Sequence, residues 1–321
     1  MKREPPRNLA ASVRQRLMNF SRARGEPFQS VLTRYAMERL LYRFSRSQAA
    51  DRYLLKGALL FQIWSDQPHR ATKDIDLLGF GAPSVQGQAD LFRSLCSLVV
   101  PEDGMEFLAE TVTAAEIRED NIYGGVRVRL TACLETARIP MQIDVGFGDA
   151  ITPPATTADF PVMLDFPAPR LRIYPPETTI AEKLHALVVL DIGNSRMKDF
   201  FDLYTLGRQF PFSAERLGGA IAATFETRAT PLPHDIPIGM TYAFAQDEMK
   251  DAQWCAFLGR QRIAAKDLQL ASVISFIAGF LWPIMCAVRD RSSWDGEWLP
   301  GGPWLGQTAD AEAERRDYGT R

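Results

Sequence analysis

The chain of 321 residues contains few cysteines and histidines, and this scarcity limits the chemistry that it can carry. Its four cysteines lie far apart and form no C-x-x-C pair, which excludes the usual spacings of structural zinc sites. The three histidines share no metal-ligand spacing, and no G-x-S-x-G motif accompanies them. We therefore assign the histidines no catalytic role and expect a reduced, cytoplasmic protein.

Long apolar segments are also scarce. Only residues 270–288 are nearly all apolar over the roughly 20 residues that a membrane-spanning helix needs. Ser272, Ser275, Gly279 and Pro283 interrupt this segment, and no apolar leader stands near the N-terminus. We expect a buried core helix here and no membrane partner.

The net charge of −2 gives no overall signature of polyanion binding, but the charge is unevenly distributed. Residues 1–47 contain eleven Lys and Arg against three acidic residues. This basic end is a candidate surface for phosphates. A solvated helix face without a ligand explains the same pattern equally well.

Apolar periodicity predicts an α+β protein made of two bodies. Helical spacing in residues 8–46, with a break at 25–27, predicts two or three helices. Period-two alternation then predicts strands over 74–80, 107–117, 126–135 and 139–147, with a helix over 86–100.

Residues 151–176 are rich in proline and are typical of a connection between two bodies. Beyond them the pattern becomes helical, and Thr179 with Glu182 fits a capping box for a helix to about residue 193. Further helices are expected over 197–209, 213–224, 241–258 and 266–289. We predict three parts: basic helices in 1–50, a core in 51–165 and a mainly helical lobe in 166–321.

Two aspartates stand two residues apart in the segment D-I-D-L-L. A strand would place Asp74 and Asp76 on one face, while Ile75 and Leu77 are buried on the other. Asp144 lies in another strand that is otherwise apolar, where a buried charge requires a partner such as a metal. Such carboxylates suit Mg²⁺ or Mn²⁺, and two ions would activate a hydroxyl and neutralise a leaving pyrophosphate.

A D-x-D pair alone is weak evidence, but its context strengthens it. Gly57 lies seventeen residues before Asp74, at an expected turn between an extended segment and a helix. Such a turn can present backbone N–H groups to a phosphate.

Several motifs occur in order: K-G-A-L-L-F from Lys56, R-A-T-K-D-I-D-L-L from Arg70, I-D-V-G-F-G-D from Ile143, T-I-A-E-K-L-H-A from Thr179 and R-M-K-D-F-F-D-L-Y from Arg196. With these motifs the chain resembles the AbiEii/AbiGii toxin family, which includes the MenT toxins and belongs to the polymerase β-like nucleotidyltransferases. The resemblance runs from about residue 9 to residue 298. It implies a bilobed protein with a nucleotidyltransferase core and a helical lobe.

The resemblance also implies roles for individual residues. Asp74 and Asp76 would bind metal, and Lys183 would hold the triphosphate of an NTP co-substrate. An acid of the K-D-x-x-D segment would complete the site. We favour Asp199 for this role, with Asp202 as the alternative on the same helix face.

Three more positions follow from the resemblance. Arg70 would meet phosphate, and the Thr72 hydroxyl would touch metal-bound groups. Relatives usually have Gly or Ser directly after the glycine at position 57, whereas this chain has Ala58. Alanine has no hydroxyl donor, which puts the pose of the nucleotide in question.

The resemblance therefore implies a toxin of a toxin–antitoxin or phage-defence system. It would transfer a nucleoside monophosphate from an NTP to an RNA 3′ end, with the tRNA acceptor end as the first candidate. A cognate antitoxin, AbiEi-like or other, is the expected partner. The alternatives are a binding module of the same fold with weakened catalysis, and an enzyme that nucleotidylates a protein or a small molecule.

Overall fold

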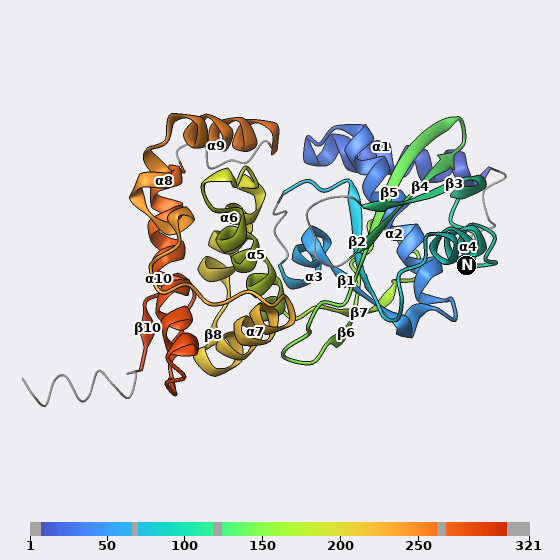
Figure 1. Ribbon diagram of the computed structural model, residues 1–321. Helices are drawn as coiled ribbons and strands as arrows, with labels where there is room; N and C mark the ends of the chain where they lie inside the picture. The colour runs from blue at the N-terminus through green and yellow to red at the C-terminus, as the bar shows by residue number, and fades with distance from the viewer. Residues whose placement is uncertain (1–7, 66–69, 118–123, 262–267, 307–321) are drawn as a thin grey trace, which may run out of the picture. The chain divides into compact units, whose positions relative to one another are not determined.

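The structure is a computed structural model that describes residues 8–65, 70–117, 124–261 and 268–306. It divides into two compact units (Figure 1). The first contains Met1–Gly148 and Ala155–Tyr174, and the second contains Asp149–Pro154 and Pro175–Arg321. A mixed sheet forms the first unit and helices dominate the second, so the predicted α+β class is confirmed.

Two helices open the described chain, α1 (Leu9–Arg24) and α2 (Phe28–Ser45). The Asn8 side chain caps α1 by accepting a hydrogen bond from the amide of Ala11 at 3.0 Å. Gly25 ends α1 with a φ of +63°, a conformation that favours glycine. The predicted break at residues 25–27 is thereby confirmed.

A seven-stranded sheet follows, in the order β3-β4-β5-β2-β1-β7-β6 (Figure 1). Its central strand β2 runs parallel to β5 and antiparallel to β1. The strands are β1 (Tyr53–Lys56), β2 (Asp74–Gly79), β3 (Glu106–Ile117), β4 (Gly125–Leu134), β5 (Ala137–Phe147), β6 (Thr156–Asp159) and β7 (Arg170–Ile173). Between β1 and β2 the chain forms the 3₁₀ turn η2 (Gly57–Leu60) and the short helix α3 (Phe61–Trp64).

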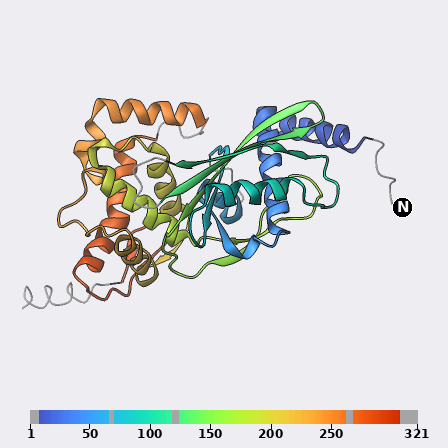
Figure 2. The ribbon, with the colours of Figure 1, turned by 45° about the vertical axis from the view of Figure 1, so that its right-hand side comes forward.

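The two faces of this sheet differ in polarity. Along β4, Val126, Val128 and Leu130 are buried, while the intervening residues are half-buried or exposed. Helix α4 (Val85–Cys96) packs against β3 and β4, and α2 packs against β5 (Figure 2). The alternation therefore builds one apolar face under helices and leaves polar side chains on the other.

The segment predicted as a connection, residues 151–176, contains two strands, so that prediction was incomplete. Strand β7 pairs in parallel with β1 through Leu55 and Ile173, and β6 pairs antiparallel with β7. The prolines lie outside these short strands, which form one edge of the sheet, where proline is tolerated. A proline-rich composition thus concealed strands of only four residues each.

The second unit is built from six α-helices and a small three-stranded sheet in the described residues. The predicted helix over 197–209 is confirmed, whereas the one predicted over 241–258 is two helices. The helices are α5 (Pro176–Leu190), α6 (Met197–Gln209), α7 (Ala214–Thr227), α8 (Tyr242–Gln246), α9 (Glu248–Gln261) and α10 (Leu270–Arg289). The strands are β8 (Phe212–Ser213), β9 (Glu297–Trp298) and β10 (Trp304–Leu305).

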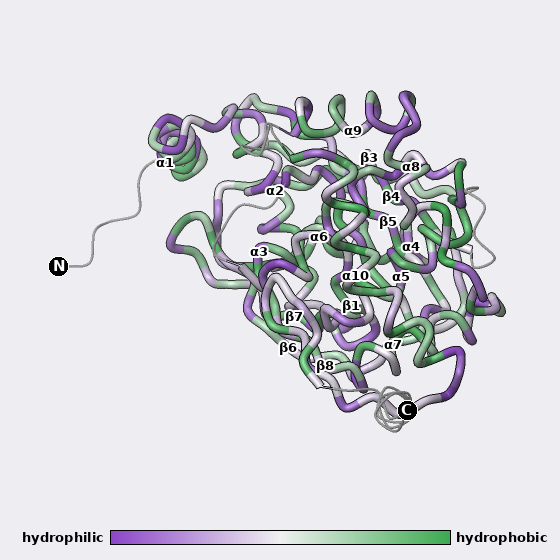
Figure 3. Tube along the Cα trace, turned by 90° about the vertical axis from the view of Figure 1, so that its left-hand side faces the viewer, coloured by the Kyte–Doolittle hydropathy of each residue, from purple (hydrophilic) through white to green (hydrophobic). Residues whose placement is uncertain are grey.

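Helix α10 is the one helix in the described ranges that is long and apolar enough to cross a membrane (Figure 3). It packs against α6, α7 and α8. Ile277, Phe280 and Leu281 are fully buried, and the Trp304 indole donates a hydrogen bond to the Phe280 carbonyl at 2.9 Å. This packing is that of a core helix.

The capping box predicted from Thr179 and Glu182 is wrong. Helix α5 begins three residues earlier, with Pro176 in its first turn. Proline is favoured there because its fixed φ suits a helix and its missing N–H would have no helical partner. Thr179 is therefore a buried helix residue, and the Glu182 carboxylate lies 3.8 Å from Arg228.

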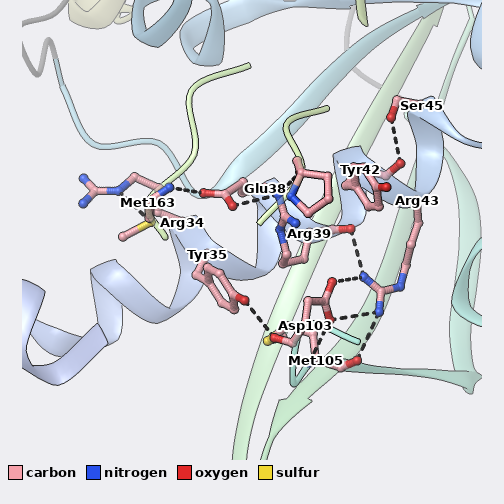
Figure 4. Close-up of polar contacts among 11 residues, drawn as sticks. Arg34, Tyr35, Glu38, Arg39, Tyr42, Arg43, Ser45, Asp103, Met105 and Met163 are labelled. Atoms are coloured by element: carbon pink, nitrogen blue, oxygen red, sulfur yellow. Dashed lines mark hydrogen bonds and ion pairs between the residues drawn. The ribbon is translucent and has the colours of Figure 1, made fainter. Parts of the chain in front are cut away.

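Helix α2 carries a buried ionic cluster (Figure 4). Arg39 is completely buried and pairs with Glu38 at 2.9 Å. Arg43 donates two hydrogen bonds to the Asp103 carboxylate, at 2.7 and 3.2 Å, and the Tyr35 hydroxyl donates to the Asp103 carbonyl at 2.7 Å. Arg43 thus contacts Asp103, and Arg39 donates a hydrogen bond to the Pro167 carbonyl at 2.9 Å, so both arginines hold α2 to the rest of the unit and are not available to a polyanion.

Three of the other arginines near the N-terminus are also paired, which weakens the expected phosphate surface, whereas Arg22, Arg24 and Arg46 are exposed. Arg14 lies 3.8 Å from Glu135, Arg34 lies 3.0 Å from Glu26, and Arg16 pairs with Asp165. Lys2, Arg3 and Arg7 lie outside the described residues. Much of the basic surplus therefore has a structural explanation.

The Arg43–Asp103 pair yields a test of this fold. We expect Asp103→Ala to lower the free energy of unfolding by about 3 kcal/mol, because it leaves a buried guanidinium without its carboxylate. Urea denaturation measures this loss. The control is Asp90→Ala, which removes the exposed Arg93–Asp90 pair and should cost less than about 1 kcal/mol. Equal losses would show that the buried pair does not stabilise the unit.

Candidate active site

The register of the central strands aligns four charged residues in one row across the sheet. Lys56 on β1 is the partner of Asp76 on β2, and Asp76 is the partner of Asp144 on β5. Asp144 is in turn the partner of Arg127 on β4. Neighbouring strands lie about 4.8 Å apart, so the two aspartates of this row are direct neighbours.

A second row lies two residues along the same strands. Asp74 is the partner of Gln142, and Gln142 is the partner of Arg129. Since side chains two residues apart share a face, both rows project from the same side of the sheet. We call this side the carboxylate face; it consists of Lys56, Asp74, Asp76, Arg127, Arg129, Gln142 and Asp144.

The alternation predicted for β2 is confirmed. Ile75 and Leu77 are 1% and 2% exposed, whereas Asp74 and Asp76 are half-buried. The apolar residues anchor the strand in the core and thereby orient the two carboxylates.

Asp144 has a guanidinium as its partner in the structure. Arg127 donates from Nε to Oδ1 at 2.8 Å and from Nη2 to Oδ2 at 2.7 Å, and Gln142 lies 3.4 Å from Oδ2. The sequence predicts a partner for this acid and favours a metal; in the structure the partner is Arg127. Arg127 was missed, although the V-R-V-R alternation of β4 places arginines on one face of a neighbouring strand.

Asp74 and Asp76 suit a hard divalent cation such as Mg²⁺, because both supply carboxylate oxygens from one face. Among the residues that the structure describes, no three His, Cys, Asp or Glu side chains are already grouped to hold a metal ion. The Asp144 carboxylate is bound by Arg127. Its place as a third metal ligand therefore stays a prediction.

Gly57 begins the turn that follows β1, as predicted. Its φ of +75° favours glycine, and a Cβ atom here would overlap the carboxylate of Asp76. The turn thus lies directly beside the Asp76 side chain. Ala58 is buried at 7% exposure, so its methyl group is part of the packing.

Thr72 and Arg70 precede β2. The Thr72 hydroxyl lies 3.3 Å from the carbonyl and 3.5 Å from the amide of Asp74, which closes the turn into the strand. Arg70 is half-buried. The predicted contacts of these two residues with phosphate and metal-bound groups stay predictions.

The second unit brings together Lys183 on α5 with Asp199 and Asp202 on α6. The Lys183 ammonium lies 2.6 Å from Asp199 and 2.8 Å from Asp202. Its side chain is 12% exposed, and those of the two acids are 3% and 0% exposed. Lys183 is therefore held between two buried carboxylates, and Asp199 and Asp202 both act as its partners.

Asp199 also accepts a hydrogen bond from Arg196 Nε at 2.6 Å. Burial favours the neutral carboxyl, but the charges of Lys183 and Arg196 outweigh it and hold the pKa of Asp199 below its ordinary value. Asp199 is consequently ionised at neutral pH. In this state it orients Lys183 and cannot donate a proton.

His185 lies near Arg228 in the same unit. Its Nε2 is 2.8 Å from the Thr230 hydroxyl, and its Nδ1 is 3.2 Å from Arg228. Burial, together with the charge of Arg228, lowers the pKa of His185 to about 4. These contacts tie α5 to the segment after α7.

Residues 39–279, about three quarters of the chain, match the family described as "Nucleotidyl transferase AbiEii toxin, Type IV TA system". The chain belongs to this family. No curated protein matches it.

Solved structures similar to this chain come from Helicobacter pylori. JHP933 is 12% identical with a TM-score of 0.47, and the match covers 91% of this chain and 98% of that one. A protein described as a "putative nucleotidyltransferase" is 13% identical with a TM-score of 0.45, covering 82% and 96%.

Membership of the AbiEii family identifies the chain as the nucleotidyltransferase toxin of a toxin–antitoxin system. A nucleotide substrate and an antitoxin partner follow from that membership. The motifs that carried the resemblance to this family lie on β1, β2, β5, α5 and α6 and in the turns next to them.

The contact between Gly57 and Asp76 yields a second test. We expect Gly57→Ala to lower the free energy of unfolding by about 1–2 kcal/mol, because alanine at positive φ is strained. It should also weaken metal binding by displacing the Asp76 carboxylate. Urea denaturation and Mn²⁺ titration measure the two effects. The control is Gly25→Ala, where φ is also positive but no atom lies within 4 Å of the added methyl group. A Gly57→Ala variant that binds Mn²⁺ like the wild type would contradict this account.

Proposed function

We propose that this AbiEii toxin transfers a nucleoside monophosphate from an NTP to the 3′ hydroxyl of RNA, with the tRNA acceptor end as the first candidate. One observation carries the proposal. Asp74 and Asp76 share a face of β2, and the Gly57 turn lies directly against the Asp76 carboxylate. The two carboxylates proposed to bind metal and a turn suited to phosphate are therefore adjacent.

The reaction joins the RNA O3′ to the α-phosphorus and breaks the bond from that phosphorus to the bridging oxygen of the β-phosphate. Pyrophosphate leaves, and the proton of the hydroxyl passes to water. Bound Mg²⁺ would lower the pKa of the hydroxyl and neutralise the leaving group. Asp74 and Asp76 would hold the metal in this scheme.

Lys183 would supply positive charge to the triphosphate. Two buried carboxylates restrict its side chain, so little conformational entropy is lost when a phosphate binds. Asp199 and Asp202 are positioning residues in this scheme.

The alternative is a binding module of the same fold with weakened catalysis, and Ala58 is the observation that favours it. Relatives usually offer Gly or Ser at this position. A thermal-shift titration with Mg²⁺ and each NTP separates the alternatives, because a module without a nucleotide site would not respond.

The first test is incorporation of labelled nucleotide. We expect Asp76→Asn to reduce labelling at least about 100-fold, because a lost metal ligand removes several kcal/mol of transition-state stabilisation. Each labelled NTP is offered with purified tRNA, total RNA, a protein lysate or an aminoglycoside. Asp159→Asn is the control, since Asp159 is an exposed acid on β6. Full labelling by Asp76→Asn would overturn the mechanism, and labelling of only the protein or the aminoglycoside would overturn the RNA acceptor.

A growth test addresses the role as a toxin that acts in the cytoplasm. Induced expression of the chain alone should arrest bacterial growth, and Asp76→Asn should restore it because turnover is lost. Colony counts after induction measure the effect, with immunoblots to show equal expression. If cells that express the wild-type chain in soluble form grow normally, the chain alone is not toxic and the proposed role is contradicted.

A further inference from the structure

We propose that Arg129 binds a backbone phosphate of the acceptor RNA strand, on the flank of the carboxylate face where the attacking 3′ hydroxyl arrives. This inference rests on the proposed function, because it assumes that RNA is the acceptor. It assigns a binding role to a residue that the family motifs leave out.

Arg129 is exposed, and the residues directly opposite it on both adjacent strands are neutral. Its partners in the register are Thr113 on β3 and Gln142 on β5. Across the described ranges, no acidic side chain forms an ion pair with Arg129. Arg127, two residues away, donates hydrogen bonds from Nε and Nη2 to the Asp144 carboxylate. The guanidinium of Arg129 therefore remains available for a ligand.

The geometry of the reaction selects this flank. Phosphoryl transfer places the attacking oxygen and the leaving oxygen on opposite sides of the phosphorus. The Gly57 turn follows β1, which borders β2 on one side, whereas β5 and then β4 lie on the other side. If the triphosphate binds at the Gly57 turn, an in-line approach along the face of the sheet brings the hydroxyl from the side of β5 and β4.

The distance fits a contact near the 3′ end. Arg129 and Asp74 belong to the same row and lie two strands apart. At the usual strand spacing, their backbones are about 10 Å apart. An arginine side chain spans most of such a gap. Its guanidinium can thus contact a phosphate close to the reacting nucleotide.

A cation is favourable at this place, because an RNA strand brings phosphate charge toward the carboxylates of Asp74 and Asp76. Arg127 already offsets the charge of Asp144. A guanidinium can bind a phosphate through two parallel hydrogen bonds and offset this repulsion. Arg39 and Arg43 of α2 cannot serve here, because they are buried in ion pairs.

Arg138 provides a matched control on the same sheet. It is exposed on β5, four residues before Gln142, and projects from the same side. Its row contains Cys133 and the acidic Glu106. At about 3.3 Å per residue, it lies about 13 Å further from the aspartates along the strand.

The experiment compares Arg129→Ala, Arg129→Lys and Arg138→Ala with the wild type in the RNA-labelling assay at several KCl concentrations. We expect Arg129→Ala to lower kcat/KM for RNA about tenfold at low salt, mainly through KM. The slope of log(kcat/KM) against log[KCl] should become less steep by about 0.7, as expected for one lost contact to single-stranded RNA. The KM for NTP and the melting temperature should not change. Arg129→Lys should keep the salt slope, and Arg138→Ala should behave like the wild type.

Two outcomes would overturn the inference: an Arg129→Ala variant with the wild-type KM and salt slope, or equal losses in Arg129→Ala and Arg138→Ala. Fluorescence anisotropy of a 5′-labelled single-stranded RNA separates this failure from failure of the proposed function. If the wild type labels no RNA but binds it in an Arg129-dependent manner, transfer to RNA is wrong and the phosphate contact is supported. If the wild type labels RNA and Arg129→Ala binds it equally well, the phosphate contact is wrong and the transfer reaction stands.

Discussion

The pairing of β2 with β1 and β5 is the constraint on which the carboxylate face depends. Because side chains alternate along a strand, a slip of one residue would bury Asp74 and Asp76 and expose Ile75 and Leu77. The buried aliphatic residues therefore fix the register, and the register places Asp76 between Lys56 and Asp144. Packing on one face of the sheet determines the arrangement of charge on the other.

In both units, buried basic side chains are paired with carboxylates, but these pairs have different consequences. Arg39 and Arg43 in α2 are buried with carboxylates, and their hydrogen bonds to Pro167 and Asp103 hold α2 to the rest of the first unit. Lys183 is equally confined by Asp199 and Asp202, but its residue type and motif point to phosphate. Burial of a paired charge is therefore not a functional signal by itself. Arg129 differs because it is exposed, and the residues directly opposite it on both adjacent strands are neutral.

The sequence predicted those features of the fold that are determined by residues close together in the chain. The alternation around Asp74, the break at Gly25 and the bounds of α6 were all accessible from periodicity and turn residues. The Arg127–Asp144 pair was not, because it requires the pairing of two strands. The start of α5 was misplaced because Pro176 begins the helix in place of the expected cap. Resemblance to the AbiEii family drew attention to Lys183 and Asp199, but only the structure shows that they contact each other.

The central claim is that Asp74 and Asp76 bind the metal on which transfer depends. Crystals grown with Mn²⁺ and a non-hydrolysable NTP analogue would test it through anomalous scattering. The account predicts an Mn²⁺ peak about 2.1 Å from carboxylate oxygens of both aspartates. An analogue bound in the crystal without an anomalous peak at these two residues, or with the only peak elsewhere, would contradict it.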